Sequence, residues 1–178
     1  MSEIVSAGRH DDGLEPPSWE IPGLIALERI VSRSDDIAIS VGPIQLYTTG
    51  ALLTLNVRFH SGVDAGSARV HTELLKLLKQ DPTPSADRLS LRVDFDDQVR
   101  TNLDSTAGST PSPRGPRLDL LSGGSQGSGW TLRYWVSPAP IAAITVQASW
   151  SGFVVPIGEV TIPTELLQAA RDSIQQLR

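Results

Sequence analysis

Hydrophobic and polar residues alternate with a period of two along several short stretches of this chain. The clearest stretch is 53–60, where Leu53, Leu55, Val57 and Phe59 alternate with polar neighbours. This spacing places the apolar side chains on one face of a strand. The same alternation predicts strands over 37–46, 89–96, 130–137 and 142–150, and shorter strands over 99–103 and 153–162.

The strand predicted over 37–46 changes phase part-way along. Ile37 and Val41 share one face, but the apolar residues after Gly42-Pro43 resume one position out of step. Because proline cannot donate to a central ladder, this change predicts a bulge or a strand-edge kink. The turn signal at 47–50 then joins this strand to the next one as a hairpin.

Apolar residues at helical spacing predict two short helices. The first covers about 66–79, with an apolar face formed by Val70, Leu74, Leu77 and Leu78. It ends before Asp81-Pro82, since the residue before a proline is unfavourable in a helix. The second covers 163–177 with Pro163 in its first turn. Its predicted apolar stripe is Leu166, Ala170, Ile174 and Leu177.

Several short strands with two modest helices predict a mainly β fold. We expect an antiparallel β-sandwich with a short central helix and a C-terminal helix; the alternative is an α+β fold, an antiparallel sheet with the helices on one face. Residues 1–20 are polar and rich in Gly, Asp and Pro, so a disordered or loosely docked tail is expected there. Residues 21–178 are expected to form a single β-rich domain with a mobile loop at 104–129, where Ser, Pro and Gly dominate.

Composition removes several classes of function. The 178 residues include no cysteine, which excludes disulfides, thiol nucleophiles and thiolate metal sites. A formal charge of -5 and a pI near 5.1 argue against nucleic acid as a partner. No apolar run approaches the roughly 20 residues of a membrane-spanning helix, and the N-terminus lacks the pattern of a secretory signal. We therefore expect a soluble cytoplasmic protein with no nucleic-acid partner, no membrane partner and no cofactor.

One segment formally matches a catalytic motif. Residues 123–127 read G-x-S-x-G, the nucleophile elbow of serine hydrolases, in which a later histidine accepts the serine proton. No histidine follows His71, and a strand rather than a helix follows the motif. A phosphate-binding loop would need a lysine and a helix here, and the segment has neither. A flexible hairpin loop is the simpler interpretation.

Three carboxylates stand close together at Asp94, Asp96 and Asp97. Such a group can hold a divalent cation or do acid–base chemistry. The alternative is a solvated strand edge that ends in a turn, with Asp94 paired across to Arg58 or Arg92. The histidines at positions 10, 60 and 71 are scattered and show no zinc-site spacing.

The strongest candidate for an interaction surface is an outward sheet face. It combines Arg and Trp, the side chains that most often anchor interfaces, and arginine over an aromatic face adds attraction. The candidate residues are Arg58, His60, Arg92, Arg133 and Trp135. The alternative is ordinary cross-strand pairing between arginine and aspartate, with Trp135 covered by the C-terminal helix.

Two segments resemble an uncharacterised family of small actinobacterial proteins. Residues 89–97 (LSLRVDFDD) are similar to the L-R-x-G-V-x-F-x-D-G-R run of that family, and 134–140 (YWVSPAP) to a Trp-rich strand that ends in P-L-P-P. A following strand with Trp150 and a helix over 163–177 extend the resemblance to about residues 89–177. It implies a shared β-rich fold in an actinobacterial cytoplasm and supplies no activity. It also leaves open that Arg92, Asp96, Trp135 and Trp150 are structural signatures.

These observations leave two kinds of function. The first is a non-catalytic protein-interaction or assembly module, which uses a sheet face to bind a protein partner or a second copy of itself. The alternative is a small-ligand or divalent-metal binding protein or a minor enzyme, with its site between the sheets or beside Asp94, Asp96 and Asp97.

Overall fold

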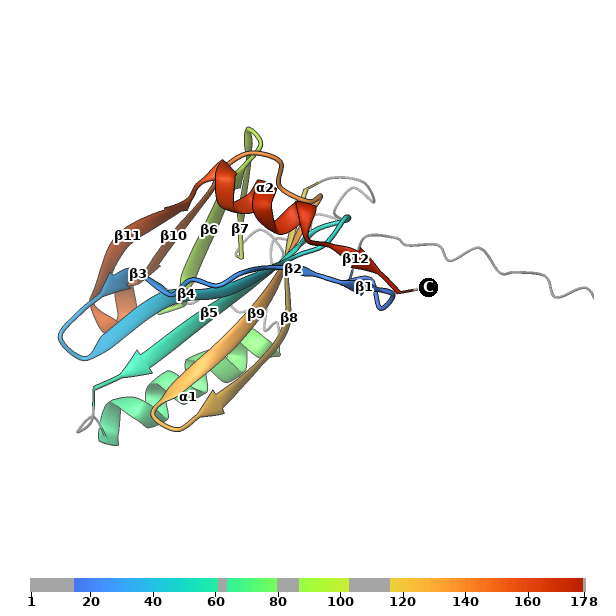
Figure 1. The fold of residues 1–178 in the computed structure, drawn as a ribbon. Helices are drawn as coiled ribbons and strands as arrows, with labels where there is room; N and C mark the ends of the chain where they lie inside the picture. The colour runs from blue at the N-terminus through green and yellow to red at the C-terminus, as the bar shows by residue number, and fades with distance from the viewer. Residues whose placement is uncertain (1–14, 61–63, 80–86, 103–115, 178) are drawn as a thin grey trace, which may run out of the picture.

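A computed structural model describes residues 15–60, 64–79, 87–102 and 116–177 of the chain. These residues form a mainly β fold with two antiparallel sheets in separate layers and two helices, as the alternation predicts (Figure 1). The elements that define the two layers come from regions far apart in the sequence.

The larger sheet has six strands in the order β2–β4–β5–β9–β8, with β3 pairing with β4 beside β2. Its strands are β2 (Gly23–Ile25), β3 (Arg29–Arg33), β4 (Ile37–Leu46), β5 (Ala51–Phe59), β8 (Arg117–Gln126) and β9 (Gly129–Ser137). The register of β4 against β5 shifts between Val41 and Ile44, which confirms the bulge predicted at Gly42-Pro43. The amide of Tyr47 donates to the carbonyl of Gly50 at 2.8 Å and closes the predicted hairpin.

The smaller sheet has four strands in the order β11–β10–β6–β7. They are β6 (Ser90–Phe95), β7 (Gln98–Thr101), β10 (Ile144–Trp150) and β11 (Val155–Ile162), and a short 3-10 helix, η2 (Ser151–Phe153), joins the last two. Asp96 and Asp97 form the tight turn between β6 and β7 with φ angles of 47° and 60°. Aspartate tolerates this left-handed conformation better than most residues, because its short side chain can bond locally. A separate two-stranded piece pairs β1 (Glu20–Ile21) with β12 (Gln175–Gln176).

The inward faces of the two sheets form one hydrophobic core. Leu55 and Val57 of β5, Val93 of β6 and Val146 of β10 are all fully buried there. Burial of each such side chain contributes roughly 1.5 to 3 kcal/mol relative to exposure. The indole of Trp150 closes one end of this core, where it packs edge-on against Phe153 with ring centroids 4.5 Å apart.

The first helix agrees with its prediction, whereas the second is shorter and buries a different leucine. Helix α1 (Asp64–Leu78) buries Val70 and Leu74 and lies beneath β8 and β9 (Figure 1). Helix α2 (Thr164–Asp172) buries Leu167 and Ala170, while Leu166 remains 43% exposed, so the predicted stripe is confirmed at Ala170 and wrong at Leu166. The helix is shorter than predicted because the chain leaves it after Asp172 and forms β12.

The predicted boundaries of loop and tail also need correction. Residues 117–126, expected within a mobile loop over 104–129, form strand β8, which pairs with β9 along its whole length. Residues 103–115 lie outside the described residues, as do residues 1–14 of the predicted tail. Within that tail, Glu20 belongs to β1, is buried, and accepts hydrogen bonds from the Thr48 amide at 2.9 Å and from the Thr48 hydroxyl.

Candidate functional site

The five residues of the predicted interaction face do not share one surface. Arg58 on β5 and Arg133 on β9 project from the outer side of the six-stranded sheet, and His60 is exposed just after β5. Arg92 lies on β6 in the other sheet and projects from the opposite side of the sandwich, since its neighbours Leu91 and Val93 face the core. Trp135 is fully buried. The prediction of a single exposed Arg–Trp face was therefore wrong.

Trp135 is buried on the outer side of its sheet, in a small cluster of its own. The cluster contains Tyr47 and Leu52, which come from the β4–β5 hairpin and not from α2. The rings of Tyr47 and Trp135 meet edge to face with centroids 5.7 Å apart. A Cβ atom on Gly50 would lie 2.3 Å from the indole, so the hairpin turn fits over the ring only with glycine there. Burial, together with the nearby Glu20 carboxylate, raises the pKa of Tyr47.

Two of the three aspartates, Asp94 and Asp96, hold backbone and side chains in place. Both oxygens of Asp96 accept backbone amides, from Ile141 and Ala142, each at 2.7 Å. Asp94 makes a bidentate pair with Arg92 on its own strand, at 2.8 and 3.0 Å, and this bond raises the pKa of Arg92. The pair runs along the strand rather than across to a neighbour. No group of three or more candidate metal ligands occurs among the described residues.

The G-x-S-x-G segment is the end of a β-hairpin. Ser125 lies in β8, and Gly127 (φ 58°) lies in the turn that leads directly into β9. Strand therefore follows strand, as the hairpin interpretation expects, and the geometry of a nucleophile elbow is absent from this part of the described chain. His71 packs edge-on against Trp130 with centroids 4.8 Å apart.

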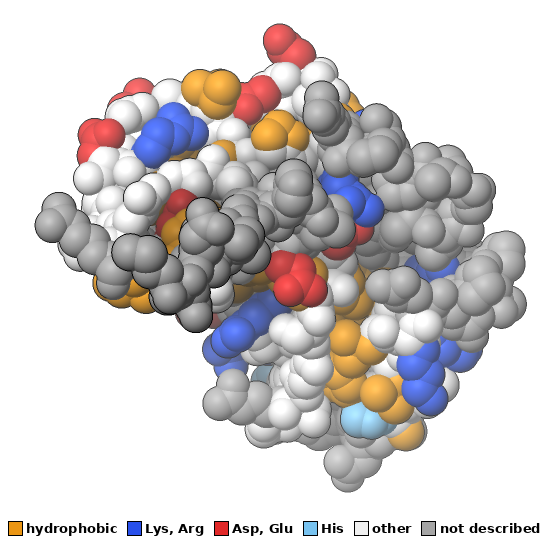
Figure 2. Space-filling view, turned by 90° about the vertical axis from the view of Figure 1, so that its right-hand side faces the viewer, with side chains coloured by type: hydrophobic (Ala, Val, Ile, Leu, Met, Phe, Trp, Pro, Cys, Tyr) orange, Lys and Arg blue, Asp and Glu red, His pale blue; other side chains and the backbone are white. Residues whose placement is uncertain are grey.

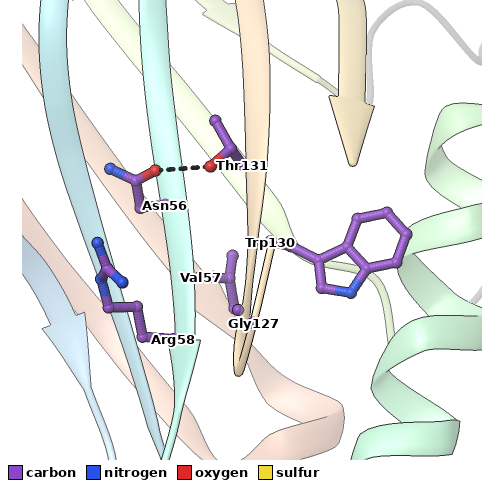
Figure 3. Close-up of a pocket in the computed structure, with 7 residues that line it drawn as sticks. Asn56, Val57, Arg58, Gly127, Trp130 and Thr131 are labelled. Carbon is purple, nitrogen blue, oxygen red and sulfur yellow. Dashed lines mark hydrogen bonds between the residues drawn. The ribbon is translucent and has the colours of Figure 1, made fainter. Parts of the chain in front are cut away.

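A shallow pocket of about 300 Å³ lies beside this turn. Figure 3 shows its polar lining on β5 and β9, with the Trp130 ring directed to the other side of β9, toward α1. The hydroxyl of Thr131 donates to the amide oxygen of Asn56 at 3.0 Å, and Arg58 lies 3.8 Å from Glu28. The lining thus offers the Arg58 guanidinium, which Glu28 partly neutralises, and the side chains of Asn56 and Thr131, which bond to each other. Among these lining residues no nucleophile contacts a base.

Strand β8 has the longest run of exposed residues among the described strands. Its first half lies beside the other sheet, where Arg100 of β7 donates to the Pro116 carbonyl at 2.7 Å. Its second half, Leu121–Ser125, is exposed at every residue and carries no charge. Among the described strands, none pairs with β8 on the side away from β9.

The register shows which backbone groups of β8 face outward. The amide of Phe59 donates to the carbonyl of Ser128 at 3.0 Å, so even-numbered residues of β9 bond to β5 and odd-numbered ones to β8. Gly124 lies opposite an odd-numbered residue and therefore bonds to β9. Gly123 and Ser125, on either side of it, direct their N–H and C=O groups away from the sheet.

Helix α1 packs beneath β8 and β9, next to this edge. His71, Leu75 and Leu78 recur at helical spacing on one side of the helix. A Cβ atom on Gly123 would lie 2.8 Å from a methyl group of Leu78, so glycine lets the helix pack directly against the edge strand. The side of the molecule in Figure 2 shows hydrophobic side chains in a stripe, with Lys, Arg and His side chains beside it. We call the space between Leu121–Ser125 and this side of α1 the β8–α1 groove.

Sequence reasoning missed the β8–α1 groove because its strand is built from serine and glycine. Such residues give no hydrophobic alternation, and their composition is typical of loops. One signal could have found it: Gly127-Ser128 is a two-residue hairpin turn placed immediately before the well-patterned strand at 130–137. A hairpin there requires a partner strand over the preceding ten or so residues.

Comparisons with known proteins give little similarity. No family model matches the chain, and no curated protein matches it. The crystal structure of the conserved domain protein from Bacillus anthracis is similar over 77% of this chain, at a TM-score of 0.40 and 9% sequence identity. This chain spans about half, 48%, of that protein's length. Similarity at this level supports no conclusion about function. Among the described residues, no helix is long and apolar enough to cross a membrane.

Proposed function

We propose that this chain is a non-catalytic protein-interaction module that binds an extended segment of a partner by adding it as a strand to β8. The observation that carries the proposal is the exposed, uncharged edge at Leu121–Ser125, with which no described strand pairs on the side away from β9. Such an edge offers a row of backbone donors and acceptors to any extended chain.

The other edges of the two sheets are closed or short, which supports a special role for β8. Strand β11 lies against β3, where the Ser32 hydroxyl donates to the Pro156 carbonyl and Gly158 packs onto the Val31 carbonyl. Strand β2 is covered by α2. Strand β7 has only four residues and carries the charged Arg100. Natural proteins protect sheet edges by such devices. The described second half of β8 has a bulge at its start and α1 packed beneath it, but it carries neither charge nor proline.

The interaction energy of an added strand would come mainly from the backbone. Each hydrogen bond formed at the edge contributes roughly 0.5 to 1.5 kcal/mol net. Gly123 and Ser125 present two N–H and two C=O groups outward, enough for about four such bonds. Burial of alternate partner side chains in the groove would supply the rest. Because backbone bonds are independent of sequence, selectivity must come from the groove.

Substitution of Ser125 tests this proposal. Ser125→Pro removes one outward N–H and keeps every bond to β9, while Ser125→Ala keeps the N–H and is the matched control. Twelve-residue peptides would be selected from a displayed random library against the wild-type protein. We expect their affinity to fall several fold, and by up to about tenfold, on Ser125→Pro and to be unchanged on Ser125→Ala, since the one bond lost is worth about 0.5 to 1.5 kcal/mol.

A second measurement uses the peptides themselves. Methylation of alternate amide nitrogens should abolish binding in one of the two alternating sets and spare it in the other, because only one set faces β8. Selected peptides that bind the proline variant as well as wild type, or a library that yields no binder at all, would overturn the proposal. Circular dichroism and melting temperature establish that both Ser125 variants are folded.

A further inference from the structure

The regular part of the β8 edge is short and bounded at both ends. The bulge between Leu120 and Ser122 interrupts the ladder at one end, and the turn residue Gly127 (φ 58°) ends it at the other. The stretch between them, Ser122–Gln126, has Gly124 at its centre. We infer that this stretch pairs, antiparallel, with the same stretch of a second copy of the chain, about a two-fold axis at Gly124. This inference rests on the proposed function, because it names the strand that the same edge binds.

The direction of the outward backbone groups fits such an axis. Gly124 bonds to β9, so it would lie opposite Gly124 of the second copy as a non-hydrogen-bonded pair, with Cα atoms about 4.5 Å apart. Gly123 would lie opposite Ser125 of the second copy, and each such pair exchanges two bonds, which gives about four in all. The bulge and the turn limit both stretches equally, so the two match over their whole length. A longer foreign strand would run into the bulge or the turn.

The space beneath the edge suits the small side chains of β8 itself. Leu78 of α1 comes so close that a Cβ atom on Gly123 would lie 2.8 Å from its methyl group. A strand added beside β8 directs alternate side chains to this same side. In a second copy these positions carry Gly123 and Ser125, which need little room. Large side chains of a foreign strand would compete with the end of α1 for this space.

The apolar end of α1 adds contact area to the pair. Two residues along the strand and one strand across separate the Gly123 positions of the two copies by about 8 Å. Helices pack at interaxial distances of about 8 to 10 Å, so the ends of the two α1 helices would meet beneath the strands. Leu75 and Leu78, which the single chain leaves partly exposed, would be covered there.

The size of this interface sets the expected affinity. One short strand and one helix end from each copy are few compared with the roughly 20 to 30 residues a side of a stable complex. We therefore expect a weak dimer, with a dissociation constant of about 10 μM to 1 mM.

The charges near the axis are compatible with a second copy. A strand that pairs with itself brings like charges together, which opposes pairing, and Ser122–Gln126 carries no charge. Ser122 would lie opposite Gln126 of the second copy, and these two polar side chains can share a hydrogen bond. Lys79, exposed one residue after Leu78, and the net charge of -5 on each chain oppose association weakly. Association should therefore strengthen as salt screens these charges.

Single cysteines test the axis directly, because the chain contains no cysteine of its own. Oxidation of Gly124→Cys at about 0.5 mM protein should give a covalent dimer, since its two Cα atoms lie within the roughly 4.4 to 6.8 Å that a disulfide spans. Ser122→Cys and Gln126→Cys should each stay monomeric alone and cross-link when mixed. The reason is that position 122 lies opposite position 126 and about 14 Å from its own copy.

Thr161→Cys, at an exposed position of β11, measures the background of random collisions. Cross-linking of Gly124→Cys only at the rate of Thr161→Cys would overturn the inference. Cross-linking of Ser122→Cys alone as fast as in the mixture would also overturn it, because the register would then be wrong.

Sedimentation equilibrium measures the reversible association of the unsubstituted chain. Ser125→Pro removes one outward N–H from each copy and should weaken dimerisation about fivefold to a hundredfold, whereas Ser125→Ala should leave it unchanged. A chain that is monomeric at about 1 mM, or a dimer that Ser125→Pro does not weaken, would refute pairing through β8.

Failure of this inference can be separated from failure of the proposed function. A chain that stays monomeric but binds selected peptides in a Ser125-dependent way refutes self-pairing and keeps strand addition. A chain that neither dimerises nor binds peptides through β8 refutes both. Peptides bound to β8 should dissociate the dimer, so a dimer that they leave intact would show association at another surface and would overturn the axis at Gly124.

Discussion

Asn102 extends the β6–β7 pairing beyond the end of β7. Its side-chain oxygen accepts the Leu91 amide at 2.9 Å, and its side-chain nitrogen donates to the Leu89 carbonyl at 2.8 Å. Its own amide donates to the Leu91 carbonyl at 3.0 Å. Asn102 is 8% exposed, and Leu89 and Leu91 are 1% and 0% exposed, so water cannot replace these bonds.

The substitution Asn102→Ala should destabilise the protein severely. It removes two hydrogen bonds and leaves one buried N–H and one buried C=O without their partners. A buried backbone group without a partner costs about 1 to 3 kcal/mol. We therefore expect a loss of about 2 to 5 kcal/mol, which is a large part of the roughly 5 to 15 kcal/mol that stabilises a typical domain.

Urea unfolding followed by tryptophan fluorescence measures this loss as a lower midpoint at unchanged slope. Gln98→Ala, at an exposed position of β7, is the control and should lie within about 0.5 kcal/mol of wild type. A midpoint for Asn102→Ala equal to that of the control would refute the reasoning, because it would show that the amide is not needed to satisfy β6.

The isosteric variant Asn102→Asp adds a test with pH. Its carboxylate can accept the Leu91 amide but places a second acceptor against the Leu89 carbonyl. Burial raises the folded-state pKa of such a carboxyl above its unfolded value near 4. The variant should therefore lose stability as the pH rises through that value, and recover part of it in acid, where the protonated group can donate.

Three further substitutions test other parts of the structure. Trp135→Ala should cost about 3 to 5 kcal/mol, measured by urea unfolding, because the indole is fully buried; an unchanged midpoint would mean that the ring is exposed in solution. Burial raises the pKa of Tyr134 above its usual value of 10.0, so wild type should lose stability above about pH 10 by up to roughly 1.4 kcal/mol per pH unit. Tyr134→Phe should flatten that decline in melting temperature, and an identical decline would contradict the assignment. Gly123→Ala brings a Cβ atom to 2.7 Å from Leu132 and should cost about 1 to 3 kcal/mol, whereas Gly124→Ala meets nothing within 4 Å. Equal melting temperatures for the two glycine variants would show that α1 does not pack closely on β8.

Side-chain alternation located the strands whose two faces differ in polarity. It placed Leu55, Val93 and Leu132 in the core, and the phase change at Gly42-Pro43 located the bulge in β4. It did not locate β8, because only Leu118 and Leu120 alternate with polar neighbours there, and the Ser and Gly residues of the second half show no difference between faces. It also put Leu166 instead of Leu167 into the apolar stripe of α2, since both fit a helical stripe with Ala170 in sequence.

The candidate site was harder to predict than the fold for a geometric reason. Alternation shows which side of its own strand a residue faces, but not which sheet the strand joins. Arg92 and Arg133 both point away from the core, and the two sheets direct them to opposite sides of the molecule. Trp135 also points outward, but the β4–β5 hairpin covers it. Only the three-dimensional pairing of strands could separate these residues.

The order in which the chain builds its two layers affects how the protein can be cut or folded. After β5 the chain crosses to β6 and β7, returns for β8 and β9, and crosses again to β10 and β11. No contiguous fragment therefore contains all the strands of one sheet without strands of the other, so truncation cannot isolate either sheet. Pairings such as β5 with β9 join residues about 80 positions apart, a high contact order typical of slow, all-or-none folding.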